Sequence, residues 1–430
     1  MALRLARKGG AVRAYHVPGL TELPGAIRGR LPPIARAVGL DAESELLYVT
    51  TPKGELLSLD LETGRLDTVA TGVVLAALGP DQTLFAVDGK RRVLTVARRI
   101  RVVWPQPLAA VPRELFGATD QRLVAVLPGD PARPSTLRLV TVAADQPPAA
   151  RTMPLAGDVA ATRWGDLVVV ASDSGVFLID PLARREPAFF ALPDHPRALA
   201  FSPSGHRIYV GQRTGAGLAV IDRYERKELD GVALPTPAAT VRLDGFGRWL
   251  LARPSIGDSV WVVDLPVKTL VGSVATSWDA DLPTITPDGS LSVAQGEDVV
   301  AYQPEGLKER GRVTGGSGDV WVFSAWRQRG AYRGAFADAP AGAAAAPGTD
   351  SVAPGGPLYV QLSSSQNQTW SSEMAQQLSR AGLPARVLPP RSLDDGYRVV
   401  LGPYPTRNEA EAIGRKLGRP FWIYQPPASP

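Results

Sequence analysis

The amino-acid sequence predicts an all-β propeller of eight blades, followed by a small α+β domain with the order βαββαβ. Two patterns predict this division. Short apolar strands separated by tight turns recur between His16 and Gln303 at a mean interval of 41 residues, and residues 357–425 change to two amphipathic helices set between strands. The composition agrees with the first pattern, because 43 Gly and 40 Pro residues in a chain of 430 imply frequent turns.

Each repeat of the first region contains two kinds of segment. One is an apolar strand that often ends in aspartate, as in Leu56–Asp60, Leu218–Asp222 and Val260–Asp264. The other precedes it and reads as strand, polar turn and strand, as in AFSPSGHRIYVGQ at 200–212. Four short antiparallel strands per unit are typical of a propeller blade. One blade is too small to bury both of its faces, so the blades must pack against one another in a ring.

The number of blades follows from the incomplete units at the two ends of the region 12–336. The first strand pair, 12–27, has no hairpin before it, whereas 318–326, with a further strand at 331–336, forms a hairpin with nothing after it. Joining these halves in one blade closes the ring and hides two sheet edges. We therefore expect eight blades, with seven blades and decorated termini as the alternative, and a basic N-terminal tail at 1–11.

The propeller region resembles the YVTN and lactonase-like family of bacterial propellers through IYVGQRTGAGLAVIDRYERKELDGVAL at 208–234 and VWVVDLPVKTLVGSVA at 260–275. The resemblance implies the fold, and this architecture hosts binders, scaffolds and enzymes alike. We expect the propeller to dock a protein partner or a ligand. The alternative is a lactonase-like hydrolase that is tethered to the cell wall.

The sequence contains no constellation of catalytic or metal-binding residues. It has no cysteine, its three histidines (His16, His195 and His206) fall in different blades without ligand spacing, and no GxSxG, HExxH or phosphate-binding motif occurs. The aspartates that end the strands, such as Asp60 and Asp222, recur regularly and are expected to form turns. We therefore expect no enzymatic activity, no catalytic residue, no metal and no cofactor.

The distribution of charge and apolar residues bears on the partners. Residues 1–34 carry a charge of +5, equal to that of the whole chain, so the remainder is about neutral. Its basic residues are not interleaved with aromatic ones, and we expect no nucleic-acid partner. No apolar run reaches the roughly 18 residues of a membrane helix, so we expect no membrane span.

The C-terminal part begins after a segment of different composition. Residues 337–356 are rich in Ala, Pro and Gly, which predicts a flexible linker. Residues 357–425 then predict strands at 358–362, 385–388, 397–401 and 421–424 and helices at 371–381 and after the capping box formed by Thr406 and Glu409. We expect one sheet with both helices on one face and an open second face, and a short tail at 426–430.

This small domain resembles the SPOR domain family. The similar segments are YVQLSSSQN, AQQLSRAGLPARV, YRVVLGPYPTRNEAEAIGRKL and PFWIY, within which the pattern RVxxGPYxTRxEAE is highly specific. The resemblance implies binding to peptidoglycan glycan strands that lack stem peptides, which occur at the division septum. It also implies a periplasmic cell-envelope protein whose leader or anchor is missing from this N-terminus. A cytoplasmic scaffold is the alternative.

The resemblance also assigns candidate glycan-binding residues. The family's strand-one glutamine and nearby serine fall on Gln361 and Ser364, its strand-three arginine on Arg398, and an apolar position of the last strand on Ile423. Many members carry an aromatic residue two positions before that arginine, where this chain has a glycine. The adjacent Tyr397 is the aromatic candidate here, although strand alternation places it on the face opposite to Arg398. Trp370 and Trp422 are further aromatic candidates.

Overall fold

The computed structural model describes residues 1–426 except 42–43, 98–99, 119–120, 144–145, 163, 182–185, 325–356, 366–367, 381–382, 391–395 and 417–421. The chain divides into two compact units, a propeller within residues 1–326 and a small domain within 357–426. The expected linker at 337–356, the expected strand at 331–336 and most of the expected tail at 426–430 lie outside the described residues.

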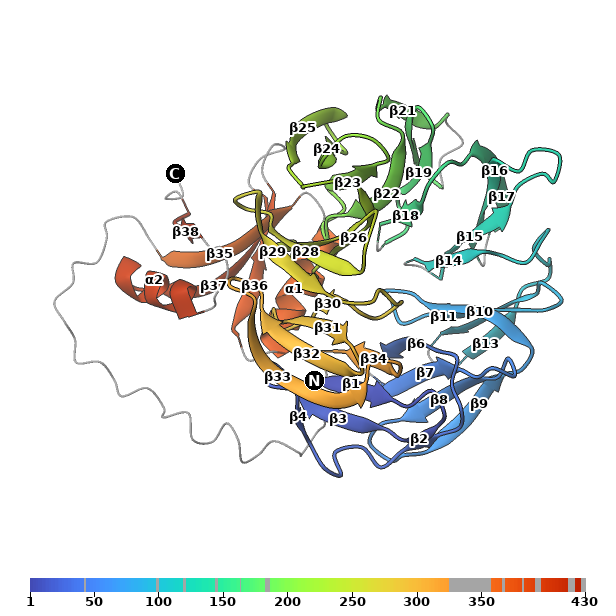
Figure 1. Cartoon of the computed structure of the whole chain (residues 1–430), viewed down its shortest axis with the longest axis horizontal. Helices are drawn as coiled ribbons and strands as arrows, with labels where there is room; N and C mark the ends of the chain where they lie inside the picture. Colours follow the sequence, from blue (N-terminus) through green and yellow to red (C-terminus); the bar gives the residue numbers. More distant parts are fainter. Residues whose placement is uncertain are drawn as a thin grey trace. The chain divides into compact units, whose positions relative to one another are not determined.

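The first unit consists of eight antiparallel sheets of four strands each, which follow one another around a ring (Figure 1). We number them as blades and list the strands from the innermost outward. Blade 1 contains β34 (Val320–Phe323), β1 (Ala2–Leu5), β3 (Arg13–His16) and β4 (Thr21–Glu22). Blade 2 contains β6 (Arg36–Asp41), β7 (Leu46–Thr50), β8 (Leu56–Asp60) and β9 (Leu66–Ala70). Blade 3 contains β10 (Val73–Leu78), β11 (Leu84–Asp88), β12 (Val93–Ala97) and β13 (Ile100–Val103). Blade 4 contains β14 (Glu114–Gly117), β15 (Leu123–Pro128), β16 (Thr136–Ala143) and β17 (Gln146–Pro154).

The second half of the ring repeats this pattern. Blade 5 contains β18 (Val159–Ala161), β19 (Val168–Ser172), β20 (Gly175–Ile179) and β21 (Ala188–Ala191). Blade 6 contains β22 (Pro196–Phe201), β23 (Arg207–Gln212), β24 (Leu218–Asp222) and β25 (Lys227–Val232). Blade 7 contains β26 (Ala238–Leu243), β27 (Trp249–Pro254), β28 (Ser259–Asp264) and β29 (Thr269–Ala275). Blade 8 contains β30 (Thr284–Ile285), β31 (Leu291–Gln295), β32 (Asp298–Gln303) and β33 (Lys308–Gly316). A two-stranded ladder joins β2 (Gly10–Ala11) to β5 (Arg30–Leu31).

Blade 1 closes the ring by combining strands from the two ends of this unit. Strand β1 lies between β34 and β3, and Leu3 pairs with Val322 on one side and with Ala14 on the other. The prediction of eight blades with one shared blade is therefore confirmed, and the alternative of seven is wrong. The division within that blade differs from the expected one, because only β34 among the described strands comes from the later segment.

The expected basic tail at 1–11 is corrected by the same blade. Residues 2–5 form a central strand, and Leu3 and Leu5 are each only 1% exposed. The alternation of apolar and polar residues in this strand is hard to recognise in the sequence, because Arg4 stands between Leu3 and Leu5 in a segment rich in basic residues. In the structure Arg4 forms an ion pair with Asp319 at 2.6 Å. The propeller thus begins at residue 2 rather than at residue 12.

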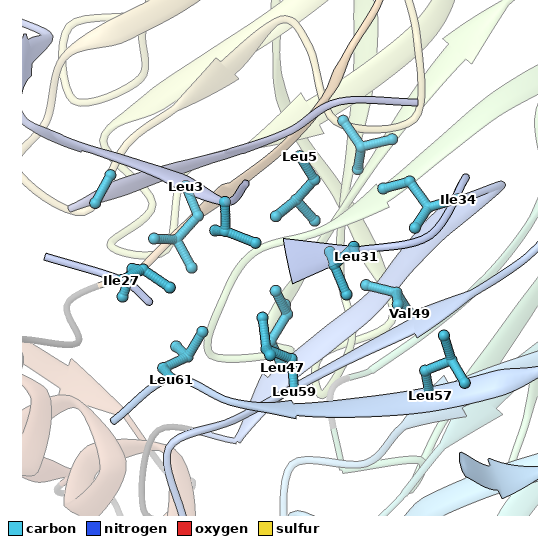
Figure 2. Packing of buried hydrophobic residues seen from close by; sticks show 13 residues of the cluster. Leu3, Leu5, Ile27, Leu31, Ile34, Leu47, Val49, Leu57, Leu59 and Leu61 are labelled. Carbon is cyan, nitrogen blue, oxygen red and sulfur yellow. The ribbon is translucent and has the colours of Figure 1, made fainter. Parts of the chain in front are cut away.

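Hydrophobic clusters hold neighbouring blades together. Each pair of consecutive blades shares one cluster among the described residues, including the pair formed by blades 8 and 1. In blade 2, Leu47 and Val49 pack toward blade 1, as Figure 2 shows, whereas Tyr48 between them packs toward blade 3. Successive side chains of a strand point to opposite faces, so one apolar strand serves two interfaces. This explains why the strands read as continuous apolar runs.

The expected role of the strand-ending aspartates in turns is confirmed at two positions. Oδ1 of Asp60 accepts hydrogen bonds from the backbone N–H groups of Glu62 and Thr63, and Oδ1 of Asp222 accepts them from Tyr224 and Glu225. These bonds stabilise the charged form of the carboxylates and lower the pKa of Asp60 and Asp222 despite partial desolvation. Both aspartates are therefore engaged in structure.

The small domain has the predicted order βαββαβ. Its elements are β35 (Leu358–Ser365), α1 (Gln368–Arg380), β36 (Ala385–Leu388), β37 (Tyr397–Tyr404), α2 (Arg407–Lys416) and β38 (Trp422–Tyr424). The sheet has the strand order β36-β37-β35-β38 and is antiparallel throughout. Helix α1 buries Met374, Ala375 and Leu378, as its amphipathic pattern predicted, and the Thr406 hydroxyl accepts the N–H of Glu409 at the start of α2. Neither described helix is long and apolar enough to cross a membrane.

The closure of the ring gives a first prediction. Leu5→Ala removes a side chain that is 1% exposed between blades 1 and 2, and we expect it to lower the free energy of unfolding of the propeller by about 2–5 kcal/mol. Leu66→Ala makes the same change at a leucine that is 37% exposed on β9, and we expect a change within about 0.5 kcal/mol. Urea unfolding of both variants measures this difference. Equal effects of the two substitutions would show that residues 2–5 are not part of the core.

Candidate functional site

The face of the small sheet that the helices leave uncovered carries polar and aromatic residues. Along β35, Val360 packs on the side of α2, so alternation places Tyr359 and Gln361 on the opposite face. In the ladder Tyr359 lies opposite Tyr424, and Gln361 lies opposite Val400. This face therefore brings together residues from all four strands of the sheet.

Two arginine–tyrosine pairs and one hydrogen bond connect these residues. Arg398 donates from Nη1 to Oε1 of Gln361 at 2.9 Å, and its guanidinium lies 4.6 Å from the centre of the Tyr424 ring. Arg386 donates from Nη2 to the Tyr359 hydroxyl at 2.9 Å and lies 4.9 Å from the centre of that ring. We call these five residues, Tyr359, Gln361, Arg386, Arg398 and Tyr424, the open-face cluster.

The members of the open-face cluster differ in accessibility. Tyr359 and Gln361 are each 8% exposed, Arg398 and Tyr424 are half-buried, and Arg386 is exposed. The cluster contains guanidinium donors, an amide and aromatic ring faces, which are the groups that bind sugar hydroxyls, acetamides and the apolar faces of sugar rings. The accessible groups are thus the arginines and Tyr424, and Gln361 holds Arg398 in place.

The structure brings some of the predicted site residues together and separates others. Gln361 and Arg398 are hydrogen-bonded, and Ser364 lies opposite Arg398 in the strand ladder. Tyr397 and Ile423, the other two candidate glycan-binding residues, lie on the face opposite to Arg398, as alternation predicted for Tyr397. Tyr397 donates from its hydroxyl to Gln368 of α1, and Ile423 packs with the cluster between sheet and helices. The reason is alternation, because each neighbours an open-face residue along its strand.

Three residues of the open-face cluster were not predicted from the sequence: Tyr359, Arg386 and Tyr424. Tyr359 could have been found, since it lies two positions before Gln361 and therefore shares its face. Tyr424 lies opposite Tyr359 only because β38 pairs with β35, a pairing that the sequence does not specify. The side chains of Trp370 and Trp422, the further aromatic candidates, lie outside the described residues.

A second group of ionisable residues lies at the beginnings of the inner strands of the propeller. Glu114 is the first residue of β14, and Asp158 immediately precedes β18 in the next blade. Both carboxylates are exposed, but protein surrounds them on most sides, and this desolvation raises the pKa of both. Their mutual repulsion contributes to the rise at Glu114, whose pKa is about 7.

The histidines of the propeller have structural partners. Nε2 of His206 lies 2.9 Å from Oδ2 of Asp222, and Nδ1 of His195 lies 2.7 Å from the backbone oxygen of Asp173. Within the described residues, no group of three His, Asp or Glu side chains is arranged so that it could hold a metal ion.

Comparisons with known proteins agree with both folds. The sequence profile of the SPOR domain family matches residues 354–420, so the small domain is a SPOR domain, a module that binds peptidoglycan. No curated protein sequence matches the chain. Among solved structures, the dihydro-heme d1 dehydrogenase NirN in complex with DHE is similar with a TM-score of 0.54 and 14% identity, covering 75% of this chain and 74% of its own. AztD from Citrobacter koseri has a TM-score of 0.52 and 13% identity, with 75% and 96% covered. These likenesses support the propeller fold alone.

The raised pKa of Glu114 predicts a pH-dependent loss of stability. The pKa rises from an ordinary value of 4.5 to about 7 on folding, so the folded protein binds this proton more tightly than the unfolded chain does. The wild-type protein therefore loses stability as the pH rises from about 4.5 to about 7. We expect Glu114→Gln to have a higher Tm than the wild type at about pH 8 and a similar Tm at about pH 4.

The control for this prediction is Glu62→Gln, which makes the same change on an exposed turn of blade 2. Its Tm should follow the wild-type pH profile. A Glu114→Gln variant whose Tm differs from the wild type by the same amount at both pH values would contradict the assignment.

Proposed function

We propose that this protein is a bacterial cell-envelope protein of the periplasm that binds peptidoglycan glycan strands lacking stem peptides, at sites of cell division or cell-wall remodelling. The observation that carries the proposal is the open-face cluster on a domain that belongs to the SPOR family. The propeller is the scaffold that is brought to the wall, where it docks a protein or a ligand.

The chemistry of the open-face cluster fits a glycan without peptides. Such a strand presents hydroxyl and acetamide oxygens, which accept hydrogen bonds from the half-buried Arg398. The Tyr424 ring beside it offers an apolar face against which a sugar ring packs. Gln361 fixes the orientation of Arg398, which lowers the entropy that is lost when a sugar binds. A stem peptide would add bulk at the same strand and hinder this approach.

The propeller supports a scaffold role through its construction. Eight blades with a shared hydrophobic cluster at each junction make a rigid ring. The loops on such a ring are suited to presenting a fixed surface to a partner.

The glycan-binding proposal predicts that Arg398→Ala weakens retention on isolated sacculi. We expect a loss of about tenfold in affinity, because the hydrogen-bond donor and the cation next to Tyr424 are removed together. Gln361→Ala should weaken binding less, since Arg398 remains but is no longer held. Co-sedimentation with sacculi, before and after amidase treatment, measures retention.

The matched control is Arg407→Ala, which removes an exposed arginine from helix α2 on the other side of the sheet. It should bind as the wild type does. Amidase treatment should increase binding of the wild-type protein, and equal binding to treated and untreated sacculi would exclude a preference for denuded strands. Thermal unfolding of each variant shows whether weaker binding results from a lost contact with the glycan or from a domain that no longer folds. Arg398→Lys tests whether binding requires the planar guanidinium.

Hydrolysis in the propeller is a second candidate function, and the pair Glu114 and Asp158 favours it. Two carboxyl groups near the beginnings of neighbouring inner strands, one with a pKa of about 7, are suited to general acid and base catalysis near neutral pH. In this reading the propeller cleaves a small ester or lactone, and the SPOR domain holds it at the wall.

The hydrolase candidate predicts that the protein opens a simple lactone and that Glu114→Gln lowers kcat by about a hundredfold. A pH-stat assay with the full chain measures the acid released. The exposed-turn variant Glu62→Gln should keep full activity. Absence of turnover by the wild-type protein for a range of lactones and esters would exclude this candidate and leave the glycan-binding proposal unaffected.

A further inference from the structure

The inner strands of four consecutive blades line a cavity of about 580 Å³ that is open to solvent. Residues of β6, β10, β14 and β18 line it together with the turn after β10, and these strands follow one another around the inside of the ring (Figure 1). Its volume lies within the range of cavities that bind small molecules. Most of the lining residues are apolar or small, including Val38, Leu78, Phe116 and Ala161, although polar atoms make up the larger part of the accessible wall.

Small residues keep this space open while the blades converge. At Gly117 a Cβ atom would lie 2.8 Å from Cα of Gly79, so the inner strands of blades 3 and 4 approach too closely for a side chain. At Gly39 a Cβ atom would lie 2.9 Å from Cδ2 of Leu78. The backbone therefore forms part of the cavity wall, and a ligand meets peptide groups as well as side chains.

Arg36 is the charged side chain of the cavity wall. It is the first residue of β6, and its Nη2 donates to the backbone oxygen of Ala76 on the neighbouring inner strand at 2.6 Å. Desolvation lowers its pKa, yet a guanidinium remains protonated at neutral pH. No carboxylate within the described part of the chain forms an ion pair with it. Arg36 is exposed, so water reaches this cation, but the cavity wall withdraws part of it from solvent and no carboxylate of those residues offsets its charge.

Three half-buried arginines of the propeller, Arg4, Arg223 and Arg242, differ from the exposed Arg36 in this respect. Arg4 lies 2.6 Å from Asp319, and Arg223 lies 2.6 Å from Asp166. Arg242 is close enough to Asp279 and Asp281 for their charges to raise its pKa against the effect of burial. Partial desolvation of a cation without an opposite charge also costs free energy, although less than full burial does. An anion bound in the cavity would place beside Arg36 the negative charge that these aspartates place beside the other arginines.

A second polar group of the wall also lacks a partner. Gln82, in the turn after β10, has a buried Oε1 that accepts no hydrogen bond from the described residues. A buried acceptor without a donor is unfavourable, and rotation of the amide would direct it to a donor in the cavity. The wall thus combines an anion-binding group, a hydrogen-bond acceptor and apolar surface.

We propose that this cavity is a binding site for a small molecule that joins an anionic group, a carboxylate or a phosphate, to an apolar body and a hydrogen-bond donor. Arg36 holds the anion through the second N–H of Nη2 together with the adjacent N–H of Nε or Nη1, since Ala76 engages one N–H of Nη2. Gln82 accepts the ligand's donor, and the apolar body packs against Phe116 and its neighbours. The inference specifies a ligand class for the propeller and does not depend on glycan binding by the SPOR domain.

The first test uses 8-anilinonaphthalene-1-sulfonate, a probe that joins a sulfonate to apolar rings and fluoresces in apolar surroundings. We expect the full chain to bind it and Arg36→Gln to weaken binding about tenfold or more, because the anion loses its charged partner. The matched control is Arg138→Gln, on an exposed arginine of β16 in blade 4, which should keep wild-type affinity. Arg36→Lys should retain part of the affinity, since it keeps the charge and loses the fork.

The second test displaces the probe from the wild-type protein with a ligand series. Phenylacetate should displace it at least about tenfold more effectively than the neutral phenylacetamide, and comparison with phenyl phosphate shows which anion the site prefers. Mandelate, which adds a hydroxyl donor to phenylacetate, should compete better than phenylacetate. Gln82→Leu should abolish this advantage, because the acceptor is gone.

Equal probe affinity of the wild-type protein and Arg36→Gln would overturn the proposal, as would equal displacement by phenylacetate and phenylacetamide. The ligand series uses the wild-type chain, so it decides the question even if the Arg36 variants do not fold. Retention of Arg36→Gln on amidase-treated sacculi should equal that of the wild type. Failure of the cavity proposal therefore stays distinguishable from failure of the glycan-binding proposal.

Discussion

The pairing of β34 with β1 is the interaction on which the propeller depends. An unclosed ring would expose the apolar face of blade 8, the apolar face of blade 2 and two strand edges. Strand β1 prevents this, since it pairs with β34 on one side and with β3 on the other. Its two leucines then join the cluster shared with blade 2, and Ala2 joins the cluster shared with blade 8. One strand of four residues thus completes two interfaces at once.

The closed ring also determines where polar chemistry occurs in the propeller. Middle strands are buried on both faces, so ionisable groups are found mainly at strand ends, in turns, on the outermost strands and along the inner edges. At the inner edges the side chains are partly withdrawn from water, which raises the pKa of Glu114 and lowers that of Arg36. Most turn aspartates, in contrast, are satisfied by backbone N–H groups and serve the fold. Partial desolvation along the inner strands therefore shifts the pKa values of Glu114, Asp158 and Arg36.

The SPOR domain, unlike the propeller, has a single sheet with only one covered face. Its helices cover one face, and the apolar residues of that face, among them Val360 and Leu401, form its core with α2. The other face cannot be apolar without exposing a large hydrophobic surface, and it carries arginines paired with tyrosines instead. Such a face is both soluble and able to bind a sugar polymer. The two units thus have separate cores.

The sequence by itself determined the repeat, the eight blades, the βαββαβ order and the resemblance to SPOR domains, because these depend on local periodicity, turn residues and a specific motif. It also brought Gln361 and Arg398 to one face. Only the tertiary structure decided that residues 2–5 form a strand, that Tyr424 lies over Arg398, and that Arg36 faces a cavity without a carboxylate. Each of these depends on which strands pair or converge across long stretches of chain. Such contacts are set by the packing of the whole ring or sheet, and no local pattern of residues encodes them.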